Sequence, residues 1–212
     1  MDFLDFLKYL PKIEKEKLLS VEAHMKMAPL ERVSSLSSQD YLDKNPRRAA
    51  VMMLLYPKNN EAHLVLIVRN SYPGIHASQI AFPGGKVEVT DIDLKHTALR
   101  ETHEEIGVKP ETVQVIKPFS ELYIPPSNFL VSPFLGVVHD EIQFYPSPYE
   151  VKKILELPLR ELLDDSIITQ VVMSTSYASN ISVPVFNVDK YVVWGATAMM
   201  MSELKETIRK VL

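Results

Sequence analysis

The pattern of hydrophobic and polar positions divides the chain into a short helical start and a longer region of mixed elements. Near the N-terminus, apolar residues recur at helical spacing, at Phe3, Leu4, Phe6, Leu7 and Leu10. Pro11 and the charged residues 12–19 follow, and they predict a second short helix. Because a membrane-binding helix needs a polar face rich in Lys and Arg, we expect this arm to pack on the core or on a second subunit.

From residue 47 onward, the pattern changes to short apolar runs with β-branched residues and turn breaks. Residues 47–57 and 63–70 flank a polar turn at Asn59 and Asn60, which predicts two joined strands. Further strands are predicted at 112–119, 129–138, 166–174 and 183–188, and helices at 92–106, 148–163 and 197–212. Strands mixed with a few helices, without strict alternation, predict an α/β or α+β sandwich around a mixed sheet.

Composition narrows the class of protein. The 212 residues are 46% hydrophobic, enough for one substantial core, so we expect a helical arm over 1–40 and a single domain over 41–212. The formal net charge of −4 gives no overall attraction to nucleic acid or to an anionic membrane, which favours a small-molecule ligand. The absence of cysteine excludes disulfides, thiolate metal sites and cysteine nucleophiles.

The chain shows no signal for membrane insertion or export. Its longest apolar run, residues 49–56, is far short of the roughly 20 residues that span a bilayer. The N-terminal segment carries acids where a signal peptide has a basic region. We therefore expect a cytoplasmic protein.

The predicted helix at 92–106 carries an unusual acidic face. At 100° per residue, Glu101, Glu104 and Glu105 fall within an arc of about 100°. A separate apolar face contains Ile92, Ala98, Leu99, Thr102 and Ile106. Acids at this spacing repel one another and oppose the helix dipole in the last turn, so a cation would stabilise them. Carboxylate oxygens suit Mg²⁺ or Mn²⁺, although an isolated acidic stretch is usually just solvated.

Glycines on either side of the helix favour a binding site. Gly84 and Gly85 stand at a predicted strand end, where glycine lets the backbone approach a ligand closely or adopt positive φ. Gly107 supplies a left-handed cap just after the acids. We expect a loop, a helix and a second loop that direct the carboxylates toward one place.

This segment resembles the Nudix box, G-x5-E-x7-R-E-U-x-E-E-x-G-U, in which U is apolar. Gly85 matches the first glycine, and the second half is matched by Arg100, Glu101, Glu104, Glu105, Gly107 and Val108. The chain departs from the box in three ways: Asp91 replaces the first Glu, Thr102 replaces the first U, and eight residues instead of seven separate Asp91 from Arg100. The departures leave the role of the first acid open. The resemblance implies a Nudix-type α/β/α sandwich with a mixed sheet.

Residues before the box resemble the extended signature of coenzyme A pyrophosphatases. The matching positions are His76, Gln79, Phe82, Pro83, Gly84 and Gly85, whereas Ser78 replaces the usual Gly and Gly74 stands where many members have Arg. Downstream, residues 127–136, 149–162 and 194–198 are similar to later segments of that subgroup. The longer spacing from Asp91 to Arg100 is also typical of it.

The family resemblance implies roles for individual residues. Glu101, Glu104 and Glu105 are expected to bind Mg²⁺ or Mn²⁺, with Glu104 and Glu105 catalytic and Arg100 orienting the glutamates. Candidates for the general base are Glu88, Glu105 and Glu150. Substrate contacts are expected from Arg69, His76, Gln79, Gly84, Gly85 and Lys86, with Arg47 and Arg48 as weaker candidates for a phosphate contact. Trp194 and Met199–Met201 are expected to pack in the core.

Three functions fit this reading. The first is hydrolysis of coenzyme A or its thioesters to 3′,5′-ADP and 4′-phosphopantetheine, free or acylated. The second keeps the Nudix chemistry but acts on ADP-ribose, NADH or dinucleoside polyphosphates. The third is a non-catalytic nucleotide-binding domain, against which the paired glutamates argue. Many relatives are dimers, so a homodimer is one expectation, and neither a nucleic acid nor a membrane partner is expected.

Overall fold

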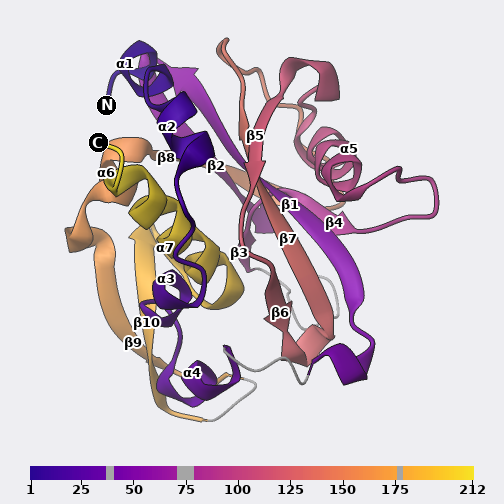
Figure 1. Ribbon diagram of the computed structural model, residues 1–212, viewed down its shortest axis with the longest axis vertical. Helices are drawn as coiled ribbons and strands as arrows, with labels where there is room; N and C mark the ends of the chain where they lie inside the picture. Colours follow the sequence, from indigo (N-terminus) through magenta and orange to yellow (C-terminus); the bar gives the residue numbers. More distant parts are fainter. Residues whose placement is uncertain (37–40, 71–78, 176–178) are drawn as a thin grey trace.

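The centre of the molecule is a mixed sheet with helices on both faces (Figure 1). The structure is a computed structural model that describes residues 1–36, 41–70, 79–175 and 179–212. The main sheet follows the order β3-β2-β1-β7-β5, and β4, β6 and β8 pair with β1, β7 and β2. Its strands are β1 (Arg47–Lys58), β2 (Glu61–Arg69), β3 (Ile80–Ala81), β4 (Gly84–Lys86), β5 (Gln114–Pro118), β6 (Leu122–Ile124), β7 (Phe129–Val137) and β8 (Val151–Pro158). Strands β1 and β7 are parallel, and the other strand pairs of this sheet in the described ranges are antiparallel.

Strand β1 shows why the sheet is covered on both faces. Its side chains alternate, so that Met53 and Leu55 join one apolar cluster while Met52 and Leu54 join another. Helix α5 (Leu94–Ile106) covers the face of Met52 and Leu54, and α1 (Phe3–Leu7), α2 (Leu10–Lys15), α6 (Leu159–Leu163) and α7 (Gly195–Arg209) lie on the other face (Figure 1). The predicted α/β/α sandwich is confirmed. None of the helices in the described ranges has the length and apolar character of a membrane span.

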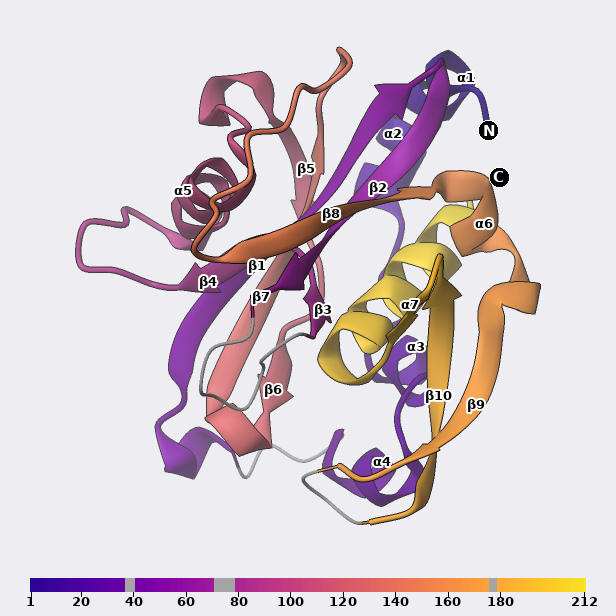
Figure 2. The ribbon, with the colours of Figure 1, turned by 180° about the vertical axis from the view of Figure 1, so that it is seen from behind.

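A second, smaller sheet stands beside α7 (Figure 2). It contains β9 (Ile168–Met173), β10 (Ile181–Val188) and β11 (Tyr191–Val193), all antiparallel in the order β11-β10-β9. Two of these strands coincide with predicted strands, but the sequence did not indicate that they form a sheet of their own.

Two details of the helix prediction are wrong. Residues 148–163 were expected to be helical, yet 151–158 form β8 and only Leu159–Leu163 is helical. Apolar residues at 151, 154 and 155 fit helical spacing, but the antiparallel register with β2 gives the β8 backbone its hydrogen bonds. Ile92, expected on the apolar helix face, lies before the start of α5 and is exposed.

The N-terminal arm packs on the core of its own chain. Besides α1 and α2, the arm contains α3 (Val21–Met25) and α4 (Leu30–Leu36). The buried carboxylate of Glu203 in α7 accepts hydrogen bonds from the backbone N–H of Ser20 at 2.8 Å and from the hydroxyl of Ser120 at 2.6 Å. The hydroxyl of Ser202 donates to the carbonyl of Ala23 at 2.7 Å. Short 3₁₀ turns occupy Leu42–Lys44, Pro110–Thr112, Pro125–Ser127 and Asp165–Ile167.

Candidate active site

The bounds of α5 are set by a cap at each end. The carboxylate of Asp93 accepts a hydrogen bond from the backbone N–H of His96 at 2.6 Å, which satisfies an N-terminal donor. Gly107 has φ of 76° and ends the helix in the left-handed conformation, as predicted. On the buried face, the hydroxyl of Thr102 donates to the carbonyl of Ala98 at 2.6 Å. This bond explains how Thr102 replaces an apolar residue of the box without leaving a buried polar group unpaired.

The two glycines make room for protein atoms. An added Cβ on Gly84 would lie 2.4 Å from the carbonyl oxygen of Ala50 in β1, and Gly84 has φ of +154°. An added Cβ on Gly85 would lie 2.5 Å from the carboxylate of Glu101. The sequence indicated glycines that admit a ligand to the backbone. In the structure, their nearest neighbours are the backbone of β1 and an acidic side chain of α5.

Arg100 connects the acids of this region. Its Nη1 donates to Glu101 Oε1 at 3.0 Å and to Glu104 Oε2 at 2.9 Å. Its Nε and Nη2 donate to the two oxygens of Asp91 at 2.9 and 3.0 Å, and Nη2 also reaches the carbonyl of Lys86 at 3.1 Å. The guanidinium therefore uses its fork geometry on Asp91 and its remaining nitrogen on the two glutamates.

Asp91 is fixed by more partners than Arg100 alone. Its side chain is fully buried and also accepts hydrogen bonds from the backbone N–H of Glu88 and the hydroxyl of Thr97, each at 2.9 Å. The bond to Arg100 holds the pKa of the Asp91 carboxyl well below its usual range. The acid whose role the sequence left open thus faces Arg100 and not the glutamate face of α5.

Glu105 has a different environment from the other two glutamates. It is 1% exposed and accepts hydrogen bonds from the backbone N–H of Gly84 at 2.9 Å and from Arg69 Nη1 at 3.0 Å. Burial raises the pKa of the Glu105 carboxyl to about 7, although Arg69 and the N–H of Gly84 oppose the rise. The charges of Glu101 and Glu150 raise it further. Ser147 joins Glu150 to this region, because its N–H donates to the carbonyl of Glu105 at 2.9 Å and its carbonyl accepts from the N–H of Glu150 at 3.2 Å.

The donor set suits a hard divalent cation. Glu101 and Glu104 both bind the same nitrogen of Arg100, so their carboxylates lie close together, and Gly85 leaves the space that the Glu101 carboxylate fills. Carboxylate oxygens are the ligands that Mg²⁺ and Mn²⁺ prefer. Among the described residues, however, no group of three acids or histidines is arranged to hold one ion. Glu105 accepts from Arg69 and from the N–H of Gly84, and the Glu101 carboxylate lies against the adjacent Gly85, so a shared cation for the three glutamates stays a prediction.

A cavity of about 600 Å³ begins beside the glycines. Five of the predicted substrate residues line it: Arg69, Gln79, Gly84, Gly85 and Lys86. The sixth, His76, lies outside the described residues. Arg47 and Arg48 do not line the cavity: Arg47 lies over the ring of Phe129 at 4.1 Å, and Arg48 forms an ion pair with Glu121.

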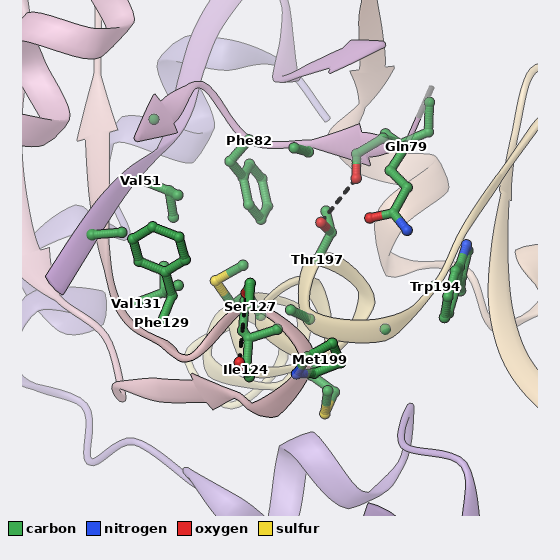
Figure 3. A pocket seen from close by; sticks show the side chains of 18 of the residues that line it. Val51, Gln79, Phe82, Ile124, Ser127, Phe129, Val131, Trp194, Thr197 and Met199 are labelled. Carbon is green, nitrogen blue, oxygen red and sulfur yellow. Dashed lines mark hydrogen bonds between the residues drawn. The ribbon is translucent and has the colours of Figure 1, made fainter. Parts of the chain in front are cut away.

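The other end of the cavity uses residues that the sequence did not suggest. Figure 3 shows Val51 and Phe129 at one side, Trp194 at the other, and Thr197 and Met199 of α7 between them. Trp194 was expected in the core but is only partly buried and lines the cavity. Met199, Met200 and Met201 are buried in the core as expected, and the first two also line the cavity. Pro29 and Arg32 of the N-terminal arm also contribute. These residues lie far from the glycines in the sequence, so no local pattern indicated that they share a site with them.

Comparisons with known proteins agree with this arrangement. A NUDIX domain model matches residues 46–169. Nudix hydrolase NudL of Enterobacter sp. (strain 638) is 34% identical over 172 residues, which are 79% of this chain and 84% of that protein. Nudix hydrolase NudL of Yersinia pestis (strain Pestoides F) is 32% identical over 180 residues, covering 82% of this chain and 85% of that protein.

Solved structures share the fold at low sequence identity. The Nudix hydrolase RenU from M. smegmatis has a TM-score of 0.54 at 14% identity and covers 79% of this chain and 88% of its own. A MutT/nudix family protein from Enterococcus faecalis has a TM-score of 0.53 at 15% identity, and the match covers 84% of this chain and 73% of that protein. Taken with the site geometry and the NudL relatives, these matches lead to one conclusion: the chain belongs to the Nudix hydrolase family, enzymes that hydrolyse phosphoric anhydrides in nucleoside diphosphate derivatives.

Proposed function

We propose that this Nudix hydrolase cleaves the pyrophosphate of coenzyme A or of its thioesters, giving 3′,5′-ADP and 4′-phosphopantetheine or its acylated form. One observation carries the proposal. Gln79, Gly84 and Gly85, which belong to the signature resembling coenzyme A pyrophosphatases, line the same cavity as the cations Arg69 and Lys86. A nucleotide with several phosphates needs such cations beyond a metal site.

Glu101, Glu104 and Glu105 would hold Mg²⁺ or Mn²⁺, and the cation would supply charge neutralisation and a bound water of lowered pKa. Arg100 keeps Glu101 and Glu104 side by side, and Asp91 keeps Arg100 in place. Glu104 is half-exposed, so its carboxylate can leave Arg100 without disturbing packed side chains. Hydrogen bonds from Arg69 and from the backbone N–H of Gly84 hold the Glu105 carboxylate beside the two glycines.

The surroundings of Glu88, Glu105 and Glu150 narrow the choice of the general base. Burial raises the pKa of both Glu101 and Glu105, and the charge of Glu150 adds to the rise. The backbone of Glu150 is bonded through Ser147 to that of Glu105, which supports grouping it with these acids. Glu88 is exposed, and its backbone N–H supports Asp91. Glu105 and Glu150 are therefore the better candidates for moving a proton from the attacking water.

The test is an incubation of the purified chain with Mg²⁺ or Mn²⁺ and coenzyme A, acetyl-coenzyme A, ADP-ribose, NADH or diadenosine polyphosphates. Products are resolved by chromatography and mass, with EDTA as the control. Metal-dependent release of 3′,5′-ADP from coenzyme A supports the proposal. Cleavage of another compound alone would keep the Nudix chemistry and reject this substrate, and no turnover of any compound would favour a nucleotide-binding domain without activity.

A further inference from the structure

We propose that the end of the cavity lined by Trp194 and helix α7 binds an alkyl or acyl chain carried by the substrate, and that this end selects among thioesters by chain length. The inference rests on the proposed function for the position of the pyrophosphate. It adds the chemical nature of the group at the far end and the residues that choose it. We call this part of the cavity the apolar chamber, and define it by Val51, Phe129, Val131, Ala196, Met199 and Met200.

The walls of the apolar chamber are hydrocarbon and thioether. Val51, Phe129 and Val131 come from the sheet, and Ala196, Met199 and Met200 come from α7 (Figure 3). Methionine is unbranched and polarisable, so two of them in one wall can adapt to a flexible apolar ligand. Burying an alkyl chain against such walls is favourable, whereas burying a charged or strongly polar group there is not.

Two hydroxyl groups in the lining of the cavity already donate to protein acceptors. The hydroxyl of Thr197 donates to the carbonyl of Ile80 at 2.9 Å, and the hydroxyl of Tyr123 donates to Asn128 at 2.9 Å. A nucleobase would need matching donors and acceptors at its edge, and any left unpaired would weaken its binding. An alkyl chain needs none. The chamber therefore favours a hydrocarbon chain over the base of the nucleotide.

The apolar chamber and the glycine end are one cavity. Val51 pairs with Gly84 across β1 and β4, so the sheet wall leads directly from the glycines into the chamber. The volume of about 600 Å³ lies within the range of small-molecule sites. A substrate with its pyrophosphate near Gly85 can therefore extend its other end toward Trp194 without leaving the cavity.

The apolar chamber also has a separate origin in the sequence. The matched NUDIX region is residues 46–169, whereas Trp194, Ala196, Met199 and Met200 come from the segment after it, and Pro29 comes from the arm before it. The Nudix core thus contributes the acids and the glycines, while the flanking segments contribute the wall of α7. The chamber thus combines sheet residues of the Nudix region with the wall of α7, which follows that region.

The first experiment compares kcat/KM for coenzyme A and its acetyl, butanoyl, hexanoyl and octanoyl thioesters, with Mg²⁺ or Mn²⁺ and the full chain. We expect roughly a two- to fourfold rise per added methylene until the chamber is filled, as burial of a CH₂ group gives. The octanoyl thioester should therefore exceed coenzyme A by at least about tenfold. A flat or falling series would overturn the inference while leaving the proposed function in place.

A pair of variants locates the effect. Ala196→Phe adds a ring inside the chamber and is expected to bring the ratio of octanoyl to unacylated kcat/KM down toward one. Val172→Phe adds an aromatic side chain at an exposed position of β9 that does not line the cavity, and should keep the wild-type ratio. Equal ratios in both variants would contradict the assignment to α7.

A binding measurement separates this inference from the proposed function. Trp194 is the sole tryptophan of the chain and lines the cavity, so its fluorescence reports on occupancy. The wild-type chain in EDTA is titrated with S-octanoyl-pantetheine, which has no nucleotide. A saturable change that Ala196→Phe weakens at least about tenfold supports the chamber even if coenzyme A is not hydrolysed. No change in the wild type would reject it even if coenzyme A is hydrolysed.

Discussion

Beside Gly84 and Gly85, at one end of the cavity, four carboxylates and Arg100 lie in one loop and one helix, and Arg69 ends strand β2. At the end lined by Trp194, methyl groups, thioethers and rings come from three distant parts of the chain. The charged end is held by directed hydrogen bonds, chiefly those of Arg100 and Arg69. The apolar end is held by packing against the core cluster that also contains Met199 and Met200.

This difference separates activity from stability. Acids at three- and four-residue spacing in the last turns of α5 oppose helix formation, and the arginines offset that effect. Changes to exposed groups of the charged end should therefore alter turnover and leave the fold intact. Changes to its buried supports should alter the fold. In each variant, Trp194 fluorescence shows independently whether the apolar end of the cavity is still intact.

The largest effect is expected for Glu104→Gln. Loss of one carboxylate that would hold the cation should lower kcat by about a thousandfold, or about 4 kcal/mol. The side chain is 52% exposed and its pair with Arg100 is of the surface i,i+4 kind, so the free energy of unfolding should change by less than about 0.5 kcal/mol. The kcat is measured by product chromatography and unfolding by calorimetry without metal. Turnover within tenfold of wild type would contradict the role of Glu104.

The next effect is expected for Asp91→Asn, which leaves the Arg100 guanidinium without its main counter-charge. The Asp91 side chain is fully buried, so the free energy of unfolding should fall by about 3 kcal/mol. Urea denaturation measures the loss. Asp93→Asn is the matched control, because Asn caps a helix as well as Asp, and it should cost less than about 0.5 kcal/mol. Similar losses in both variants would show that Asp91 has no special role.

The two glycines give opposite predictions for the same substitution. Gly85→Ala displaces the flexible end of Glu101, so turnover should fall by about a hundredfold with little loss of stability. Gly84→Ala would clash with the backbone of Ala50 and Val51, and should therefore destabilise the fold. Activity and thermal unfolding are measured on both. If Gly85→Ala keeps wild-type turnover, the position of the Glu101 carboxylate is not needed for catalysis.

The smallest effect concerns the pH dependence of stability. Because the pKa of Glu105 is raised from 4.5 to about 7, the folded chain binds more protons than the unfolded chain between these values. Its free energy of unfolding therefore falls as pH rises through this window, by about 2 to 3 kcal/mol from this group. The Gln side chain of Glu105→Gln does not titrate. In EDTA, the free energy of unfolding of this variant relative to wild type should therefore rise by about 2 to 3 kcal/mol from pH 4.5 to 7. If urea denaturation gives the same pH dependence of stability for wild type and Glu105→Gln, the raised pKa of Glu105 is contradicted.

Local patterns in the sequence predicted the elements whose contacts are close along the chain. The β1–β2 hairpin, the C-terminal end of α5 and the cap at Gly107 all depend on neighbouring residues. The helical prediction over 148–163 failed because β8 is defined by its partner β2, about 90 residues earlier, and the spacing of its apolar residues suits either structure. The separate sheet of β9, β10 and β11 was missed for the same reason.

The charged end of the cavity was predictable because its residues lie in one segment of about 25 residues with fixed helical geometry. The partners of Glu105 were not predictable, since Arg69, which donates to it, comes from another element and stands at a register shift between β2 and β8. The apolar end gave no local signal. Met199 and Trp194 look like ordinary core residues until α7 is placed against the sheet.

The bond between Ser20 and Glu203 joins residues 183 positions apart. During synthesis at about 5 to 20 residues per second, the arm therefore leaves the ribosome roughly 10 to 40 seconds before its partner in α7 exists. The Nudix core, including β1 to β8 and the acids of α5, is translated in that interval. A nascent chain can thus form its charged end early, whereas the α7 wall of the cavity is completed only after the core has been translated.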